Sequence, residues 1–378
     1  MKKVLLILLT IFVAFSADAF KKPKFKPYVI ENLEPRPDFW KVRPVEVIDL
    51  CKNVKKGEAK VVAKTPLGYP VYAVFYGDFS DPAPQTNWSA GNSSTSIKAY
   101  LGPGVGKQTI MFIAGVHGSE PENVAAAMNM IQMLETGKDF RGETDAEFLS
   151  LASKYRIIIM PCVNMDGRLI SPDHFRNQPY EIFRGCSQGW WKDGSLVGWK
   201  GSKEWFPLPL DKVKYPGGYP NSEGYNIQHD ACPGDMKTEE AKAVCRVMAR
   251  YRVDFMLNGH SCEAFPYVIY PSQVDNDVHK ERLARLGDSI NHAFHEAGLT
   301  PHDRKFKTCA TTINLTNFCN FCSGGIAFTL ECNHSCYNAK GIICTQSFEE
   351  MMAPAMIALK VAMKDGLDSP LASRPAAK

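Results

Sequence analysis

The chain has 378 residues, of which 45% are hydrophobic and 22% are charged, so it can bury a large core. Its 44 basic and 40 acidic residues nearly balance, which argues against nucleic acid as a partner. Lys2 and Lys3 precede an apolar run, and Ala17-Asp18-Ala19 then offers a cleavage site, as in secretory signal peptides. The run is too short to span a bilayer. We therefore expect a secreted or periplasmic protein with no membrane contact after cleavage.

Composition divides the chain into four parts. Residues 1–19 form the expected signal peptide, and 20–37 form a basic N-terminal arm. One folded domain is expected over 38–365, followed by a polar tail over 366–378. The sequence leaves open whether the arm is a cleaved propeptide or an ordered segment.

Hydrophobic periodicity predicts the elements in chain order. A hairpin is expected over 60–76, with its turn at Leu67-Gly68-Tyr69-Pro70. Buried strands are expected over 110–116, 155–163, 253–258 and 325–330, and helices over 45–54, 122–135, 238–250, 281–297 and 348–363. A long loop is expected over 78–106. The stretch 169–225 has little periodicity, and loops of this length in compact domains are usually functional.

Polar residues follow several of the predicted strands. His117 and Glu120 come directly after the strand at 110–116, His260 follows the strand at 253–258, and Glu331 ends the strand at 325–330. Strands that alternate with helices imply a mostly parallel sheet covered on both faces. The carboxyl ends of such strands form the ligand-binding edge of the sheet, so we expect these four side chains to gather there.

This set of residues is suited to metal-assisted hydrolysis. Two histidine nitrogens and one carboxylate leave a coordination position of zinc open for water, as in catalytic zinc sites. Zinc acidifies that water and polarises a carbonyl under attack. A nearby carboxylate can then accept the water proton and pass it to the leaving amine, a role that fits Glu331.

Four motifs occur in the order and approximate spacing of the zinc carboxypeptidases of the carboxypeptidase A type: His117-Gly-Ser-Glu120, Asn164-Met-Asp-Gly167, His260-Ser261 and Thr329-Leu-Glu331. The chain resembles this family over roughly 39–362. The resemblance implies an α/β/α sandwich around a mixed, mostly parallel sheet of about eight strands. It also implies that His117, Glu120 and His260 bind one Zn²⁺ per chain and that Glu331 is the general base.

The sequence departs from the family where the substrate is held. The family's Asn-Arg pair, whose Arg binds the substrate carboxylate, is replaced by Gln228 and His229 in the stretch that also contains Asn226. Losing a planar guanidinium is not a conservative change. Three hypotheses follow: His229 binds the carboxylate, a lysine from the Trp-rich loop binds it (Lys192, Lys200 or Lys203), or the enzyme cleaves amides without a free carboxylate.

Two further family groups have no clear equivalent. A second arginine, which polarises the carbonyl, should follow the Asn-Met-Asp-Gly motif, and Arg176 is the first candidate, with Arg184 and Arg168 behind it. A phenolic tyrosine upstream of the base is missing from 311–327. We therefore expect a carboxypeptidase-like hydrolase acting on peptide or peptidoglycan-derived substrates. The alternatives are a zinc amidase, endopeptidase or deacylase on cell-wall peptides, and a non-catalytic peptide- or glycan-binding relative.

The 12 cysteines allow other readings. In an exported chain they favour disulfides. A structural zinc site is a weaker alternative at Cys319-x-x-Cys322 and Cys332-x-x-x-Cys336, because no histidine has the usual spacing. Cys262 and Cys332 lie beside the proposed site and are the alternative nucleophiles.

Overall fold

The computed structural model describes residues 20–79, 107–232, 234–262, 265–271, 277–300, 309–310, 313–337, 345–369 and 371. The expected signal peptide, nearly all of the loop at 78–106 and most of the tail lie outside these residues. Among the described residues, none of the helices combines the length and hydropathy that a membrane span requires.

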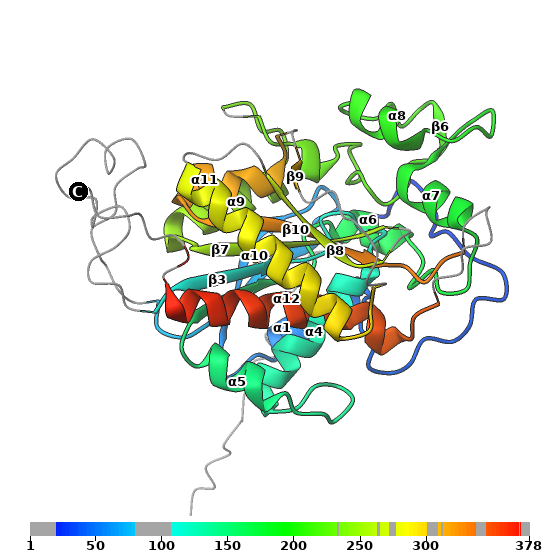
Figure 1. Ribbon diagram of the computed structural model, residues 1–378. Helices are drawn as coiled ribbons and strands as arrows, with labels where there is room; N and C mark the ends of the chain where they lie inside the picture. Colours follow the sequence, from blue (N-terminus) through cyan, green and yellow to red (C-terminus); the bar gives the residue numbers. More distant parts are fainter. Residues whose placement is uncertain are drawn as a thin grey trace, which may run out of the picture.

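A mixed sheet forms the centre of the described part of the chain (Figure 1). Its eight strands follow the order β1-β2-β4-β3-β7-β10-β8-β9. The central four, β4, β3, β7 and β10, pair in parallel, whereas β1–β2, β2–β4 and β10–β8 are antiparallel. The strands are β1 (Glu58–Lys64), β2 (Pro70–Tyr76), β3 (Thr109–Ile113), β4 (Arg156–Met160), β7 (Phe255–Cys262), β8 (Tyr267–Pro271), β9 (Cys309–Ala310) and β10 (Ile326–Asn333). The predicted mixed, mostly parallel sheet is confirmed.

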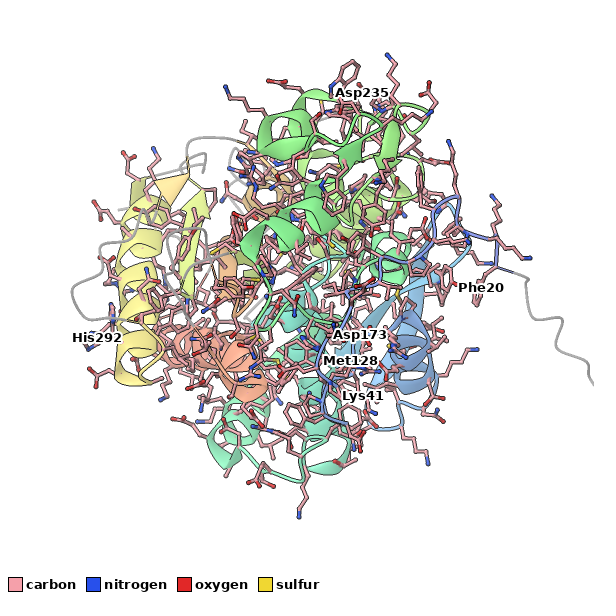
Figure 2. The ribbon with its side chains drawn as sticks, turned by 90° about the vertical axis from the view of Figure 1, so that its right-hand side faces the viewer. Phe20, Lys41, Met128, Asp173, Asp235 and His292 are labelled. Carbon is pink, nitrogen blue, oxygen red and sulfur yellow. The ribbon has the colours of Figure 1, made fainter. Side chains whose placement is uncertain are left out.

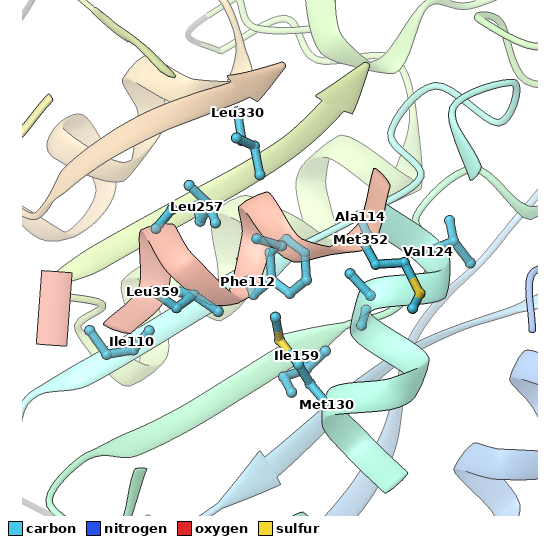
Figure 3. Close-up of a cluster of buried hydrophobic side chains, with 14 of the residues drawn as sticks. Ile110, Phe112, Ala114, Val124, Met130, Ile159, Leu257, Leu330, Met352 and Leu359 are labelled. Atoms are coloured by element: carbon cyan, nitrogen blue, oxygen red, sulfur yellow. The ribbon is translucent and has the colours of Figure 1, made fainter. Parts of the chain in front are cut away.

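Helices cover both faces of the sheet, as predicted. Alternate residues of β3 enter different cores: Ile110 and Phe112 face one layer, and Met111 and Ile113 face the other (Figure 3). Burial on both faces explains why the strand sequences are continuously apolar. The first layer contains α1 (Pro44–Lys52), α4 (Pro121–Thr136), α5 (Ala146–Ala152), α10 (Asp277–Glu296) and α12 (Phe348–Asp368). The second contains α9 (Glu239–Tyr251), η2 (Leu315–Asn317) and α11 (Phe318–Ser323).

The strand ends differ from the prediction: β3 and β4 end three residues early, at Ile113 and Met160, whereas β7 and β10 run on past the predicted ends. β7 and β10 do not stop before His260 and Glu331 but pair in register through Cys262 and Asn333. The backbone of both residues is therefore held by the sheet ladder, and only their side chains are available to a ligand. The apolar pattern predicted ends that are too early, because the last residues of both strands include polar side chains that line the candidate site.

The stretch at 169–225 is more regular than its sequence suggests. With its flanks it forms α6 (Met165–Ile170), α7 (Tyr180–Gln188), β5 (Trp190–Trp191), α8 (Gly198–Glu204), β6 (Val213–Tyr215) and η1 (Ile227–His229). The elements from α7 to β6 pack around two small apolar clusters of their own, whereas Met165 of α6 and Ile227 of η1 belong to the main cores. Apart from α7, which is amphipathic, these elements are too short to show a hydrophobic period, so tertiary contacts decide where they form. Figure 1 shows α6, α7 and α8 gathered at one end of the sheet.

The N-terminal arm at 20–37 is ordered against the domain. Phe20 stacks on Tyr69 with ring centroids 4.2 Å apart, and Tyr28 stacks on Trp190 at 5.3 Å. Figure 2 shows the arm crossing the molecule from Phe20 to the neighbourhood of Asp173. These contacts place the arm against the turn between β1 and β2 and against β5.

Candidate metal centre and active site

Three side chains converge at the carboxyl ends of β3 and β7. One ligand atom from each of His117, Glu120 and His260 lies within 4.8 Å of the others, and all three residues are buried. Glu120 Oε1 is 2.9 Å from His117 Nδ1, and Glu120 Oε2 is 2.9 Å from His260 Nδ1. The two imidazole Nδ1 atoms are 3.1 Å apart. The sequence-predicted ligands thus form one cluster.

The backbone around the first two ligands has little space for side chains. His117 and Glu120 lie in the turn between β3 and α4, where Gly118 N–H donates to the carbonyl of Gly218 at 2.7 Å. A Cβ atom on Gly118 would lie 2.1 Å from the backbone nitrogen of Arg168, so this position requires glycine. The Asn164-Met-Asp-Gly167 motif therefore supports the ligand turn directly.

The chemistry of the cluster fits a zinc ion. His117 Nε2 lies 3.1 Å from Asn226 Oδ1, an acceptor, so Nε2 carries the proton and Nδ1 presents a lone pair toward the cluster. Burial lowers the pKa of His117, which keeps the imidazole neutral. Burial also raises the pKa of Glu120, but the two adjacent imidazoles outweigh that effect and hold it well below its ordinary range. Burial opposes protonation of His260, but the Glu120 and Glu331 carboxylates outweigh it and raise the pKa of His260, so zinc would displace a proton from this ring on binding. Two histidine nitrogens and one carboxylate are the donor set of catalytic zinc sites.

Glu331 lies beside this cluster on β10. It pairs in register with His260 on the neighbouring strand, and its side chain is half-buried. Burial raises its pKa to about 7, with a further upward contribution from the Glu120 carboxylate and opposing contributions from His260 and His334. A carboxyl with a pKa near the working pH is suited to accept and return a proton.

Tyr219 forms one wall of the site and was missed from the sequence. Its ring stacks on His117 with centroids 3.8 Å apart and planes 13° from parallel. Burial raises the pKa of Tyr219 well above its ordinary value, and the phenol hydrogen-bonds to Gln188. Arg184 Nη2 donates to the side-chain Oε1 of Gln188 at 3.3 Å. No sequence motif marks Tyr219 or Gln188, because both act through contacts distant in the chain.

The stretch with Asn226, Gln228 and His229 replaces the family's carboxylate-binding Asn-Arg pair, here called the clamp, and its three side chains have different roles. Asn226 orients His117 and also donates to the Ser202 carbonyl of α8 at 3.3 Å. Gln228 is turned into the sheet, where its Oε1 accepts from Asn258 Nδ2 at 2.9 Å. His229 is half-buried beside the cluster, and burial, with the charges of His117, Lys203 and His260, lowers its pKa to about 3. His229 is therefore neutral at physiological pH and can offer only a neutral hydrogen bond.

Among the lysines proposed to replace the clamp, Lys203 is placed best. Its Nζ lies 3.7 Å from the ring centroid of Trp199, and burial lowers its pKa. It is close enough to His229 to depress that residue's pKa. Lys192 and Lys200, in contrast, are exposed.

The three candidate arginines have different surroundings. Arg176 Nη1 is 2.6 Å from Glu34 Oε1, and its Nε donates to the Gln346 carbonyl at 2.8 Å, so it ties the N-terminal arm to the domain. Arg168 is buried and donates to the Ser171 carbonyl at 2.8 Å. Only Arg184, of these three, connects to the site in the described contacts, through Gln188 and Tyr219.

The ten cysteines whose side chains the structure describes are free thiols, so it shows none of the expected disulfides among them. Burial raises the pKa of Cys332 well above its ordinary value, so this thiol is protonated and a poor nucleophile. Among the described residues, the only group of His, Cys, Asp and Glu close enough to share a metal is the His117, Glu120 and His260 cluster. The alternative of a cysteine zinc site therefore receives no support from the described part of the chain.

Buried Glu240 of α9 anchors the turn that precedes Asn226. Its Oε1 accepts from Asn221 Nδ2 at 3.2 Å, and burial raises its pKa to about 7. The pKa of Glu240 is higher in the folded chain than in the unfolded chain. As pH rises between these two values, ionisation favours the unfolded chain, so the free energy of unfolding falls. We expect wild-type stability to fall by up to about 3 kcal/mol between pH 5 and pH 8 through this group. Glu240→Gln, which keeps the acceptor, should remove this loss, as denaturant unfolding at both pH values would show; parallel pH curves would contradict the assignment.

A family model described as zinc carboxypeptidase matches residues 91–327, more than half of the chain. The chain belongs to this family. The matched stretch contains all three predicted ligands and ends just before Glu331. No curated protein matches the sequence.

Solved structures show the same fold at low identity. A metallo-carboxypeptidase from Burkholderia cenocepacia has a TM-score of 0.54 and 14% identity, over 85% of this chain and 69% of that one. Bovine thrombin-activatable fibrinolysis inhibitor has a TM-score of 0.50 and 13% identity, over 87% of this chain and 99% of that one. At these identities the likeness concerns the fold, whereas the site argument rests on this chain's own residues.

Proposed function

We propose that this zinc carboxypeptidase family member is an exported hydrolase that removes C-terminal residues from peptides, with one zinc per chain. The observation that carries the proposal is the buried cluster of His117, Glu120 and His260 with Glu331 paired in register beside His260. These four groups provide the metal ligands and the base that amide hydrolysis requires. Export rests on the expected signal peptide at 1–19.

A zinc ion held by His117, Glu120 and His260 would supply two effects: it would polarise the scissile carbonyl and acidify the attacking water. Glu331 accepts the water proton and then delivers it to the leaving nitrogen, as its pKa of about 7 permits. Tyr219 and Asn226 hold His117 in the orientation and tautomer that direct Nδ1 inward. Arg184, rather than Arg176, is our candidate for the group that faces the substrate carbonyl, because Arg176 is committed to Glu34.

We further propose that Lys203 binds the terminal carboxylate in place of the family's arginine. Lys203 is the half-buried cation beside His229, at the position where the family's clamp is altered. Trp199, which is 47% exposed, supports the ammonium group and leaves it accessible. His229 can add one neutral hydrogen bond to the same carboxylate.

Lys203→Ala should lower kcat/KM for peptides with a free C-terminus by about 10- to 100-fold, the range for losing a charge-assisted hydrogen bond. Peptides amidated at the C-terminus should be cleaved poorly by both proteins, with little difference between them. Lys200→Ala, on the same helix but exposed, is the matched control and should resemble wild type. Equal losses for free and amidated peptides would remove Lys203 from the carboxylate site.

One observation favours a second function. Gln228 is occupied by Asn258, and a lysine is a less specific carboxylate ligand than arginine. The alternative is therefore a zinc amidase, endopeptidase or deacylase acting on cell-wall peptides. Metal content and cleavage of paired free and amidated substrates test both: one zinc per chain with cleavage confined to free carboxylates supports the carboxypeptidase, and equal cleavage supports the alternative. A wild-type protein that binds peptide without cleaving either would indicate a non-catalytic relative.

A further inference from the structure

Glu122 lies two residues after the ligand Glu120, in the first turn of α4, and its side chain is fully buried. Its two carboxylate oxygens have separate partners on two other elements. Ser261 Oγ donates to Glu122 Oε2 at 2.7 Å, and His334 Nδ1 lies 2.9 Å from Glu122 Oε1. One carboxylate therefore joins α4 to the ends of β7 and β10.

The next residue of α4 reinforces the same connection. Asn123 Nδ2 donates to the His260 carbonyl at 2.8 Å and lies 3.4 Å from Cys332 Sγ. A Cβ atom on Gly259 would lie 2.5 Å from Asn123 Cγ, so the strand has a glycine where Asn123 packs against it. The start of α4 thus contacts the chain immediately around both His260 and Glu331.

The sequence positions of these contacts relate them to the reaction. Ser261 directly follows the ligand His260, and His334 lies three residues beyond the base Glu331. Glu122 follows the ligand Glu120 by two residues. The carboxylate of Glu122 therefore fixes the segments that carry two metal ligands and the base relative to one another.

Removing these polar groups from water costs free energy, which suggests that their benefit lies in fixing the relative positions of α4, β7 and β10. Glu122 and His334 are both 0% exposed, and the His334 ring lies 3.7 Å from the ring of Phe183 on α7. The buried Arg168 guanidinium is near enough to Glu122 for their charges to interact. Apolar side chains of the same volume would often give a protein of equal stability. The role to test for this network is therefore conformational specificity rather than stability.

We propose that Glu122 is a positioning residue for the metal centre, acting through Ser261 and His334. The inference rests on the proposed function, since it assigns what these residues do for zinc binding and for Glu331. Outer partners of metal ligands commonly change metal affinity or activity by 10- to 100-fold. In the described contacts, Glu122 does not bond to the side chain of a proposed ligand. It acts on the position of the ligands through the ends of α4, β7 and β10, which it holds together.

The test measures zinc dissociation constants by chelator competition, together with kcat and KM on a peptide substrate. Glu122→Ala and His334→Ala should each raise the zinc Kd about 10- to 100-fold and lower kcat by a similar factor, with KM within about twofold of wild type. Glu122→Gln keeps the shape and one acceptor and should recover part of both losses. Ser261→Ala, which removes one small hydroxyl, provides a variant that folds if Glu122→Ala does not.

His279→Ala is the matched control, because His279 is buried on α10 and hydrogen-bonds to Asn320 at 3.3 Å, outside this network. It should lower the Tm without changing the zinc Kd. If the network variants lower the Tm but retain wild-type zinc Kd and kcat, the positioning role is wrong while the proposed function stands. If the wild-type protein binds no zinc, the proposed function fails and this inference fails with it.

Discussion

Glu331→Gln is expected to lower kcat by about 10²- to 10⁴-fold, the range for removing a general base, while KM changes little. The substitution removes the proton acceptor but preserves the shape of the side chain on β10. Zinc content should stay at one per chain, because the three proposed ligands are untouched. Steady-state kinetics on a free-carboxylate peptide and metal analysis of the same sample measure both quantities.

A remote isosteric change provides the control for this experiment. Glu296 lies on the exposed face of α10, so Glu296→Gln should leave kcat unchanged. Loss of zinc from Glu331→Gln would mean that Glu331 is a ligand rather than the base. Full activity of Glu331→Gln would exclude the proposed proton transfer.

His117→Ala is expected to weaken zinc binding by more than about 100-fold, since loss of an outer partner alone reaches that size. The purified variant should hold well below one zinc per chain and show no measurable turnover. The wild-type protein should gain thermal stability as zinc is added, because a ligand that binds only the folded state stabilises it, and the variant should not. Metal analysis and zinc-dependent thermal unfolding provide the measurements.

His292→Ala is the control for His117→Ala, because His292 lies on the outer side of α10, away from the cluster (Figure 2). It should bind zinc like the wild type. Zinc that remains at one equivalent in His117→Ala would place the metal elsewhere. The family membership would then describe the fold of this chain but not its metal site.

The sequence was informative about the site wherever a local pattern carried the information. The apolar run at 110–116 followed by His117-Gly-Ser-Glu120 identified a strand and two ligand candidates together, although β3 ends three residues earlier, at Ile113. His260 and Glu331 were found in the same way, after other apolar runs. That the four converge followed from the rule that parallel strands present their carboxyl ends at one edge of a sheet.

The arginine and clamp assignments could not be decided in this way. The sequence put Arg176 ahead of Arg184 and Arg168, and only tertiary contacts show that Arg176 pairs with Glu34 while Arg184 donates to Gln188. The three candidate lysines were separated only by burial.

The sequence by itself determined the fold class, the order of the longer strands and helices and the candidate ligands and base, because these depend on periodicity and on residues close together in the chain. Only the tertiary structure showed that Tyr219 stacks on His117, that Asn226 sets its tautomer and that Glu122 joins Ser261 to His334. Such pairs lie about a hundred residues or more apart. Their partners are chosen by packing in three dimensions, which leaves no local pattern in the sequence.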